Sequence, residues 1–430
     1  MPPLRIVTAP ALTAEERSRL FARGRSLDDF MPPTREIMDE VRAGGDAALL
    51  ELTERFDGVR PARLAVTDAE RREAIMTLSD ETMRALEDAV TAIRAFHRRQ
   101  LPREGAVRTA PGVIAWREWR PLERVGLYIP GGRAPLASSV LMLGVPAAIA
   151  GCRDVILCTP PGPDGSVPAA TLAAAEMAGI HQIFKVGGAQ AIAAMAYGTE
   201  TIPPVQKVFG AGNRYVTAAK LLAFPACDID LPAGPSELVI IGDETAPPAW
   251  LAADLLSNAE HGPDSASVLF TDSCLLAKAV RDEVTAQLAT LPRRTIAERA
   301  LRDVGLIVVT EGLEEAVRLT NEYAPEHLEI VVAEPRSLLP RITNAGSIFL
   351  GPYAPNAAGD FATGTNHVLP TAGFARTHGA VSVESFGRLV QVQEVTAEGI
   401  AGLRPTIEAL AQAEGLEGHA RAAQIRETTA

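Results

Sequence analysis

Short apolar runs alternate with alanine-rich stretches through the middle of the chain, from Arg124 onward. The apolar runs at 125–129, 155–158, 183–186 and 205–209 have the length of buried strands. The alanine-rich stretches at 136–150, 168–179, 189–197 and 215–224 have the length and composition of helices. Strands that alternate with helices predict βαβ units and a parallel sheet.

A second series of the same kind follows a break at Leu231-Pro232-Ala233-Gly234-Pro235-Ser236. Its strands are expected near 238–241, 267–271, 306–309, 328–331 and 347–350, with helices between them. The segment 351–379 is rich in Gly, Pro, Thr and Asn, which predicts an extended functional loop. The pattern therefore indicates the α/β class, with two α/β halves.

The N-terminal part is predicted to be helical. Thr13 with Glu16, and Thr67 with Glu70, have the spacing of capping boxes. Five later residues recur at spacings of three and four, as on one face of a long helix: Met83, Leu86, Val90, Ile93 and His97. His97 is therefore expected to be a packed or surface helix residue rather than a ligand.

The length of 430 residues is too great for one simple core, so two or more domains are expected. The hydrophobic content of 47% and charged content of 22% are typical of a soluble globular enzyme. The formal net charge of −12 argues against nucleic acid as the main partner, because phosphate binding needs a basic surface.

The spacing of the cysteines and the length of the apolar runs indicate where in the cell the protein is expected. Cys152, Cys158, Cys227 and Cys274 show no CxxC spacing, which argues against a disulfide framework or a thiolate zinc site. The N-terminus lacks the apolar core of a signal peptide. The longest apolar stretch, at 140–150, is broken by a glycine and a proline and is too short to span a bilayer. We therefore expect a cytoplasmic protein with no membrane partner.

Three strand ends of the first series are rich in glycine. They are Tyr128-Ile129-Pro130-Gly131-Gly132, Lys185-Val186-Gly187-Gly188-Ala189-Gln190 and Val208-Phe209-Gly210-Ala211-Gly212-Asn213. Glycine lets the backbone approach a phosphate, and a following helix N-terminus offers free N–H donors. None of the three matches GxGxxG, and a tight turn is the better interpretation of any one loop. Three such loops on one sheet edge favour a dinucleotide cofactor.

A candidate metal site begins in the stretch Asn258-Ala259-Glu260-His261-Gly262-Pro263-Asp264. The amide and the imidazole stand at i and i+3 near a predicted helix end, so both side chains should share one face. Zn²⁺ takes imidazole nitrogen and carboxylate oxygen. His261, Asp360 and His419 would supply three ligands and the Asn258 amide oxygen a fourth. Taken alone, each histidine is better explained as a structural residue.

A second candidate is the pair Glu326-His327, which follows Tyr323-Ala324-Pro325. An adjacent acid and imidazole offer a general base that titrates near neutrality and a carboxylate that can orient or deprotonate water. A salt-bridged surface pair explains these two residues equally well.

Taken together, these segments resemble the histidinol dehydrogenase family over almost the whole chain. The early segments that carry the resemblance are 124–132, Gly187-Gly188-Ala189-Gln190-Ala191-Ile192, Leu231-Pro232-Ala233-Gly234-Pro235-Ser236-Glu237 and Ala259-Glu260-His261-Gly262. The later ones are Ala324-Pro325-Glu326-His327-Leu328, Gly359-Asp360, 364–371 and Ala413-Glu414-Gly415-Leu416 before His419. So many segments in the same order make the resemblance specific.

The resemblance implies a zinc- and NAD-dependent dehydrogenase that oxidises L-histidinol to the aldehyde and then to L-histidine. By position it gives the metal ligands Asn258, His261, Asp360 and His419, with one zinc ion per subunit. It gives Glu326 and His327 as the catalytic pair and Tyr128, Gln190 and Asn213 as cofactor contacts. The substrate contacts would be Ser236, Asn258, His261, Glu326, His327, Asp360, His367, Glu414 and His419.

Three positions depart from the pattern of the family. Asn258 stands where the family usually has glutamine, so its carbonyl is one methylene shorter and a water could fill the gap to the metal. Ala211 replaces a proline of the Gly-x-Gly-Asn loop, which should loosen that turn. Phe361 replaces a tyrosine beside Asp360 and loses its hydroxyl.

The resemblance also implies two incomplete Rossmann-like domains in an intertwined homodimer. The expected division is an N-terminal helical arm at 1–25 and an NAD-binding domain at 128–235. The ranges 26–127 and 236–380 would form the domain that carries most metal and acid–base residues. A helical C-terminal extension at 381–430 would reach the active site of the partner subunit.

Two other functions compete with histidinol oxidation. One is a dehydrogenase of the same family acting on another small alcohol, such as a sulfonated diol. Glu414 and His367 favour histidinol, because an acid suits a cationic substrate and repels a sulfonate, whereas Asn258 keeps the alternative open. The other is a zinc hydrolase in which Glu326 activates water, and the glycine-rich strand ends argue against it.

Overall fold

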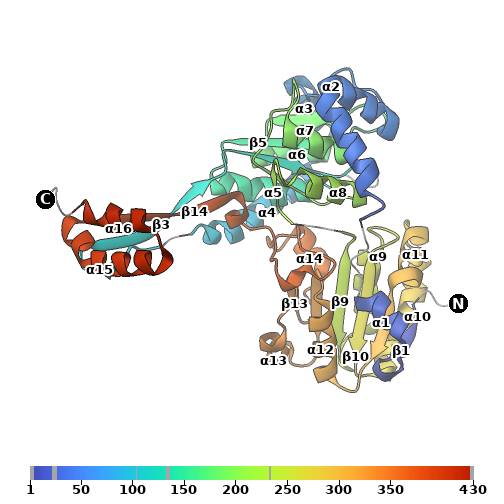
Figure 1. The fold of residues 1–430 in the computed structure, drawn as a ribbon. Coiled ribbons are helices and arrows are strands. Elements are labelled where there is room, and N and C mark those ends of the chain that lie inside the picture. The colour runs from blue at the N-terminus through green and yellow to red at the C-terminus, as the bar shows by residue number, and fades with distance from the viewer. Residues whose placement is uncertain (1–3, 22–26, 103, 132–135, 232–233, 427–430) are drawn as a thin grey trace.

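Two parallel sheets form the body of the protein, and an arm projects from it (Figure 1). The computed structural model describes residues 4–21, 27–102, 104–131, 136–231 and 234–426. The parts of the segments discussed above that lie outside these ranges are residues 1–3, 22–26, 103, 132–135, 232–233 and 427–430. The parallel sheets confirm the α/β class predicted from the sequence.

The first series of strands folds as predicted. Within the described ranges it forms a five-stranded sheet in the order β6-β5-β4-β7-β8, with every pair parallel. The strands are β4 (Arg124–Tyr128), β5 (Asp154–Thr159), β6 (Gln182–Lys185), β7 (Lys207–Phe209) and β8 (Asp228–Ile229). The helices are α5 (Ala137–Ala150), α6 (Ala169–Ala178), α7 (Gly188–Tyr197) and α8 (Arg214–Ala223). The two-residue strand β8 was not predicted.

The second series also folds as predicted, into a sheet of six described strands in the order β1-β11-β10-β9-β12-β13. The strands are β1 (Ile6–Thr8), β9 (Glu237–Gly242), β10 (Ala266–Thr271), β11 (Leu306–Val309), β12 (His327–Val331) and β13 (Ser347–Leu350). The helices are α9 (Pro248–Ala259), α10 (Cys274–Leu288), α11 (Arg294–Val304), α12 (Leu313–Tyr323), α13 (Pro335–Leu338) and α14 (Asn356–Phe361).

Two details of this sheet differ from the prediction. The edge strand β1 comes from the N-terminal part, which was expected to be helical, and pairs in parallel with β11. These three residues are stabilised as a strand by β11, which lies far along the chain, so no local sequence pattern predicts the strand. The predicted loop 351–379 is interrupted by α14, which carries Asp360.

The N-terminal helices are α1 (Ala14–Phe21), α2 (Met31–Asp57), α3 (Asp68–Ile75) and α4 (Asp80–His97). Both predicted capping boxes form, and His97 is buried on the predicted face of α4. α2 packs on α7 and α8, α3 on α6, and α4 on α5 and α6. α2, α3 and α4 therefore pack with the helices of the five-stranded sheet, and α1 packs on α12.

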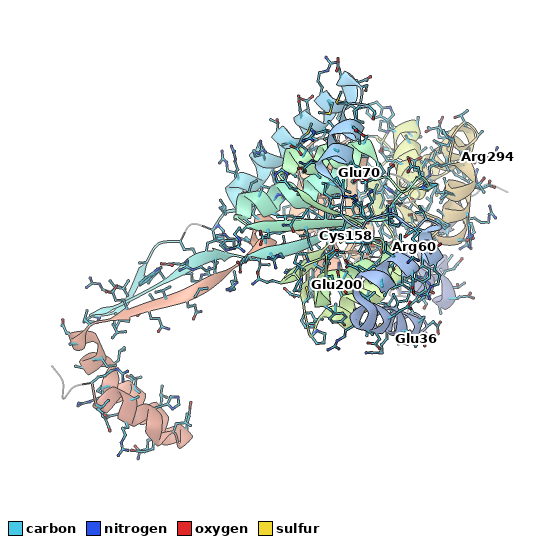
Figure 2. The ribbon with its side chains drawn as sticks, turned by 90° about the horizontal axis from the view of Figure 1, so that it is seen from above. Glu36, Arg60, Glu70, Cys158, Glu200 and Arg294 are labelled. Atoms are coloured by element: carbon cyan, nitrogen blue, oxygen red, sulfur yellow. The ribbon has the colours of Figure 1, made fainter. Side chains whose placement is uncertain are left out.

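A narrow antiparallel sheet and two helices form the arm (Figures 1 and 2). Its strands, in the order β14-β3-β2, are β14 (Gly387–Val395), β3 (Val113–Pro121) and β2 (Val107–Ala110). The helices α15 (Ala397–Glu414) and α16 (Glu417–Gln424) stand at its far end. The sequence predicted the helical tail but not the sheet.

The other predictions about cysteines and membrane segments can be compared directly. All of the cysteines are described, and each has a free thiol. Among the described residues, no helix has the length and apolar composition that a bilayer span requires.

Candidate functional site

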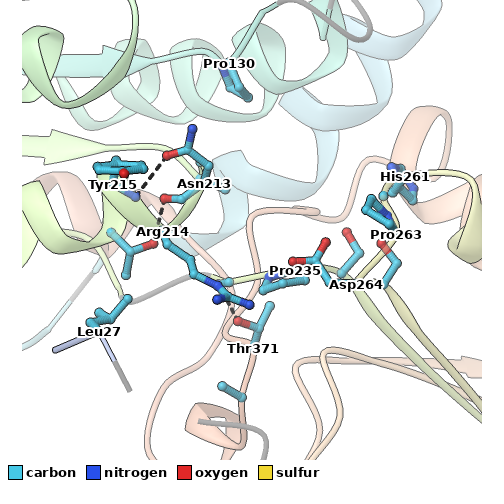
Figure 3. Close-up of a pocket in the computed structure, with 18 of the residues that line it drawn as sticks. Leu27, Pro130, Asn213, Arg214, Tyr215, Pro235, His261, Pro263, Asp264 and Thr371 are labelled. Carbon is cyan, nitrogen blue, oxygen red and sulfur yellow. Dashed lines mark hydrogen bonds between the residues drawn. The ribbon is translucent and has the colours of Figure 1, made fainter. Parts of the chain in front are cut away.

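A cavity of about 1950 Å³ lies between the two sheets. Residues at or beyond the carboxyl ends of strands line it on the side of the five-stranded sheet: Tyr128, Gly188, Gln190 and Asn213. On the other side, the lining residues lie at the amino ends of strands: Ser236, Glu237, Ala266 and Leu306. Figure 3 shows Asn213 and Tyr215 on one wall and His261, Pro263 and Asp264 on the other. The carboxyl edge of one sheet thus faces the amino edge of the other.

The three predicted cofactor contacts share this cavity. The Tyr128 hydroxyl accepts a hydrogen bond from the Gly188 N–H at 3.2 Å, so two of the glycine-rich loops meet there. Burial raises the pKa of Tyr128 to about 12, so the hydroxyl keeps its proton at neutral pH and can donate it. Gln190 is buried on the first turn of α7.

Asn213 has a structural task that the sequence did not reveal. It is the N-cap of α8, and its Oδ1 accepts from the N–H groups of Tyr215 at 3.0 Å and Val216 at 3.2 Å. Such a cap satisfies two of the free donors at a helix start. The amide oxygen is therefore used within the protein, and the exposed Nδ2 remains to donate to a ligand.

A buried charge pair fixes the loop that carries Asn213. Lys220 donates from Nζ to the carbonyl oxygens of Gly210 and Leu231, both at 2.9 Å, and pairs with Asp230. Asp230 in turn accepts from the Gly210 N–H at 2.8 Å. Gly210 has φ +121°, and a Cβ there would lie 2.1 Å from the Tyr128 carbonyl oxygen. The pair thus ties the glycine-rich loop to the segment that leaves this sheet.

Glu326 and His327 lie at the start of β12 and are held by the main chain of Glu237 on β9. Glu326 Oε2 accepts the Glu237 N–H at 2.8 Å. His327 Nδ1 lies 3.1 Å from the Glu237 carbonyl oxygen, and since a carbonyl only accepts, Nδ1 carries the proton. The two side chains are 7% and 6% exposed, so the alternative of a surface salt bridge is wrong.

This tautomer leaves His327 Nε2 as the basic atom. Nε2 has no hydrogen-bond partner among the described residues and lies 3.7 Å from Asp360 Oδ1. Burial lowers the pKa of His327, but the charges of Glu326 and Asp360 raise it by more, so it lies well above its ordinary value. The two carboxylates therefore make this imidazole a stronger base.

Asp360 lies on α14 beside two imidazoles. His367 Nδ1 donates to the Asp360 carbonyl oxygen at 3.0 Å, and His367 Nε2 lies 3.0 Å from Ser139 Oγ. Burial raises the pKa of Asp360, but His327, His367 and His261 lower it by more, so the group is a carboxylate at neutral pH. His367, predicted as a substrate contact, thus also holds the segment that carries Asp360.

Asn258 and His261 do not share a face as predicted, because α9 ends at Ala259 before His261 is reached. Asn258 is fully buried, and its Nδ2 donates to the Ala266 carbonyl oxygen at 2.8 Å and to Ser267 Oγ at 3.0 Å. Its Oδ1 is buried without a hydrogen-bond partner among the described residues. His261 instead lines the cavity (Figure 3).

The predicted metal ligands are only partly brought together within one chain. Glu414 ends α15 and His419 lies on α16, and both are exposed on the arm, away from α9 and α14 (Figure 1). Across the described part of the chain, no group of three or more His, Cys, Asp or Glu side chains is arranged to hold a metal ion.

A buried carboxyl group, Glu329, and a half-buried one, Asp254, form a pair near His327. Glu329 follows His327 by two residues on β12, accepts the Asn356 N–H at 2.7 Å and lies beside Asp254 of α9. Burial raises the pKa of Asp254 to about 6, and burial and Asp254 together raise that of Glu329 well above its ordinary value. The pair therefore holds a proton to a higher pH than ordinary carboxyl groups do.

We expect Asp254→Asn to flatten the pH dependence of stability. A carboxyl whose pKa is raised by folding contributes stability at low pH and loses it as the pH rises from about 4 to about 6. The variant lacks this titration. Its free energy of unfolding, relative to that of the wild type, should therefore be roughly 1–2 kcal/mol higher at pH 7 than at pH 4. Urea unfolding at both pH values measures this, with the exposed Asp88→Asn as control. An equal change in the free energy of unfolding between the two pH values for wild type and Asp254→Asn would contradict this prediction.

Comparison with known proteins places this site in a family. The model of the family described as histidinol dehydrogenase matches residues 22–427. The chain belongs to the histidinol dehydrogenase family. The family resemblance read from the sequence is therefore confirmed, and the chain is an oxidoreductase of the kind that acts in histidine biosynthesis.

Individual members of the histidinol dehydrogenase family match over nearly their full length. Histidinol dehydrogenase of Vibrio parahaemolyticus serotype O3:K6 is 48% identical over 428 residues, 98% of each chain. That of Xanthomonas campestris pv. campestris is 50% identical over 421 residues, 96% of this chain and 97% of the relative. The crystal structure of histidinol dehydrogenase from Elizabethkingia anophelis matches with a TM-score of 0.94 at 41% identity, covering 100% of this chain and 99% of that one.

Several residues that shape the site were not predicted from the sequence. Glu237 ends the segment 231–237, but its role was not predicted. Its main chain holds Glu326 and His327, and its Oε1 accepts the Ala372 N–H at 2.9 Å. Lys220 and Asp230 carried a weak signal, since an ionisable residue within an apolar helix suggests a buried partner.

Proposed function

We propose that this member of the family oxidises L-histidinol through L-histidinal to L-histidine, with NAD as hydride acceptor and one zinc ion per subunit. The observation that carries the proposal is the buried Glu326–His327 pair, which is held by the main chain of Glu237, a residue that lines the cavity. The other wall of that cavity carries Tyr128, Gln190 and Asn213. An acid–base pair thus lies beside a surface suited to a dinucleotide.

The donor atoms suit zinc in kind. The buried Oδ1 of Asn258 has no partner among the described residues, which fits an amide oxygen kept for a cation despite its shorter side chain. His261 and Asp360 add an imidazole and a carboxylate, and these three residues with His419 would hold the ion. Zinc, when bound, would grip the imidazole and amino nitrogens of the substrate and so orient its alcohol.

The cofactor side suits NAD, which when bound accepts the hydride. The Tyr128 hydroxyl and the Asn213 Nδ2 are available donors, and the N-terminus of α7 adds main-chain N–H groups. Ser236, His367 and Glu414 are proposed to contact the substrate, and the carboxylate of Glu414 suits its cationic amine.

The catalytic roles follow from the two side chains of the pair. His327 takes the hydroxyl proton on Nε2, the atom left without a partner, as the hydride leaves carbon. Glu326 uses one oxygen to accept the Glu237 N–H, which leaves Oε1 to deprotonate the water that adds to the aldehyde. His327 then serves again in the second oxidation. Retention of the aldehyde in the site prevents its escape.

We also propose a homodimer in which the arm of each subunit completes the site of the other. The four apolar core clusters of the described chain contain no residue from 387–426. The 18-residue helix α15 buries only Gly399 and Ala411 among its described side chains, while Leu410 is 59% exposed. A helix of this length draws its stability from packing, so the arm needs another surface. A cytoplasmic location, with the other enzymes of amino-acid biosynthesis, is part of the proposal.

The decisive experiment is the stoichiometry of NADH production from L-histidinol, before and after treatment with a chelator. Two NADH per histidinol, lost with the chelator and restored by Zn²⁺, are expected. Oxidation of a sulfonated diol with no turnover of histidinol would instead favour the other dehydrogenase. Hydrolysis without NADH would favour the hydrolase.

Exchange of the arm is tested by mixing subunits. Inactive His261→Ala and His419→Ala homodimers should regain activity when they are dissociated and reassociated together, because each mixed dimer then holds one intact site. Activity that stays at the level of the separate variants would show that each site uses its own arm.

A further inference from the structure

Asp57 is the last residue of α2, a position at which a carboxylate destabilises the helix. The C-terminus of a helix carries partial negative charge, so a carboxylate there is unfavourable. Asp57 Oδ2 is buried and has no hydrogen-bond partner among the described residues. Burial raises the pKa of Asp57. Asp57 is half-buried and contributes nothing to helix capping, and its buried, unpartnered oxygen points to a ligand.

Asp57 lines the same cavity as Tyr128, Pro160 and Gly188. The segment after α2 explains how it arrives there. Leu64 and Val66 bond to β6, and Ala65 forms an antiparallel bridge with Phe184. Because the two segments run antiparallel, residues before 64 extend past the carboxyl end of β6. Asp57 is thus brought to the carboxyl edge of the five-stranded sheet. There its charge contributes to the raised pKa of the Tyr128 hydroxyl.

The fold lacks the acid that dinucleotide-binding sheets usually carry. In such sheets, an Asp or Glu after the second strand binds the 2′-hydroxyl of the adenosine ribose. The strand order β6-β5-β4-β7-β8 corresponds to that arrangement, with β5 as the second strand. β5 is followed by Pro160, Pro161 and Gly162. The next acid, Asp164, already accepts from the N–H and Oγ of Ser166.

The wall that α2 contributes to the cavity is acidic. Among its described residues that line the cavity, the ionisable ones are Glu36, Glu40, Arg55 and Asp57. The guanidinium of Arg55 lies 3.4 Å from the carboxylate of Glu40, with which it forms an ion pair. Figure 2 shows Glu36 on this helix at the outside of the body. Three carboxylates against one cation would repel a phosphate group placed beside them.

We propose that Asp57 binds the 2′-hydroxyl of the adenosine ribose in the cofactor and thereby selects NAD over its 2′-phosphorylated form, NADP. This inference rests on the proposed function, because it assumes a nicotinamide dinucleotide in the cavity. α2 then supplies from outside the sheet the acid that β5 lacks. Asp57 acts on cofactor choice and not on the chemistry of the alcohol.

The test compares Asp57→Asn and Asp57→Ala with the wild type in kcat/KM for NAD and for NADP, at saturating L-histidinol. A hydrogen bond to a charged group corresponds to about a tenfold to hundredfold effect. We expect the preference for NAD over NADP to fall at least about tenfold in both variants. Asp57→Asn should keep more affinity for NAD, because its amide can still bond to a hydroxyl. Asp39→Asn, an exposed change on the same helix outside the cavity, should leave the preference unchanged.

Equilibrium binding of NADH and NADPH, followed by their fluorescence, separates this inference from the proposed function. If the wild type does not reduce NAD with histidinol, the proposed function fails, and the ratio of the two dissociation constants still tests Asp57. A ratio in Asp57→Asn and Asp57→Ala within twofold of the wild type would overturn the inference. Both variants remove an unfavourable charge from a helix end, so they should fold.

Discussion

His327→Asn is expected to lower kcat for both oxidation steps by roughly a hundredfold to ten-thousandfold, the range that a general base contributes. Asparagine can still donate to the Glu237 carbonyl oxygen, as Nδ1 of His327 does at 3.1 Å in the wild type. It has no basic nitrogen in place of Nε2, the atom that lies near Asp360 without a hydrogen-bond partner among the described residues. Single-turnover NADH formation from L-histidinol, and separately from L-histidinal, measures both steps.

The control for this variant is His181→Asn, because His181 is exposed and interacts with Arg71 far from the cavity. It should retain wild-type rates. The affinity for substrate should fall far less than kcat in His327→Asn, since the main action of the residue is on the reacting proton. Loss of affinity with an unchanged kcat would assign His327 to binding and contradict its role as base.

Glu326→Gln is expected to separate the two steps. Glutamine can still accept the Glu237 N–H, which Glu326 Oε2 accepts at 2.8 Å, so the start of β12 should keep its conformation. It cannot deprotonate water, so oxidation of L-histidinal should fall roughly a hundredfold or more, while oxidation of L-histidinol falls less than about tenfold. The yield should therefore move from two NADH per histidinol toward one on the time scale of the first step.

Glu334→Gln provides the matched control, because Glu334 follows the same strand at its opposite end and is exposed. Its two half-reactions should match those of the wild type. If Glu326→Gln slowed both half-reactions equally, the water-activating role would be wrong, and Glu326 would then act by orienting His327, whose Nδ1 lies 3.5 Å from Glu326 Oε2.

Much of the site could be predicted because its residues stand in short motifs next to strands. Tyr128, Gln190 and Asn213 lie in glycine-rich segments at strand ends, and all three line one cavity. The prediction that Asn258 and His261 share a face was wrong, because β10 binds the Asn258 amide and α9 ends before His261. The role of Glu237 was not predicted, because its main-chain N–H and carbonyl groups make the hydrogen bonds to Glu326 and His327. Every residue type except proline has both groups, so residue type does not indicate such a role.

The sequence by itself determined both series of strands and helices, since apolar periodicity reports the local burial of each element. It also determined the family, because many short motifs occur in a specific order. The tertiary structure decided which sheet edges face the cavity, with which sheet α2, α3 and α4 pack, and that Asp57 arrives beside Tyr128. It also decided that the last 40 described residues form an arm with β3, away from the core. These features depend on contacts between residues far apart in the chain, and no pattern within a short window contains them.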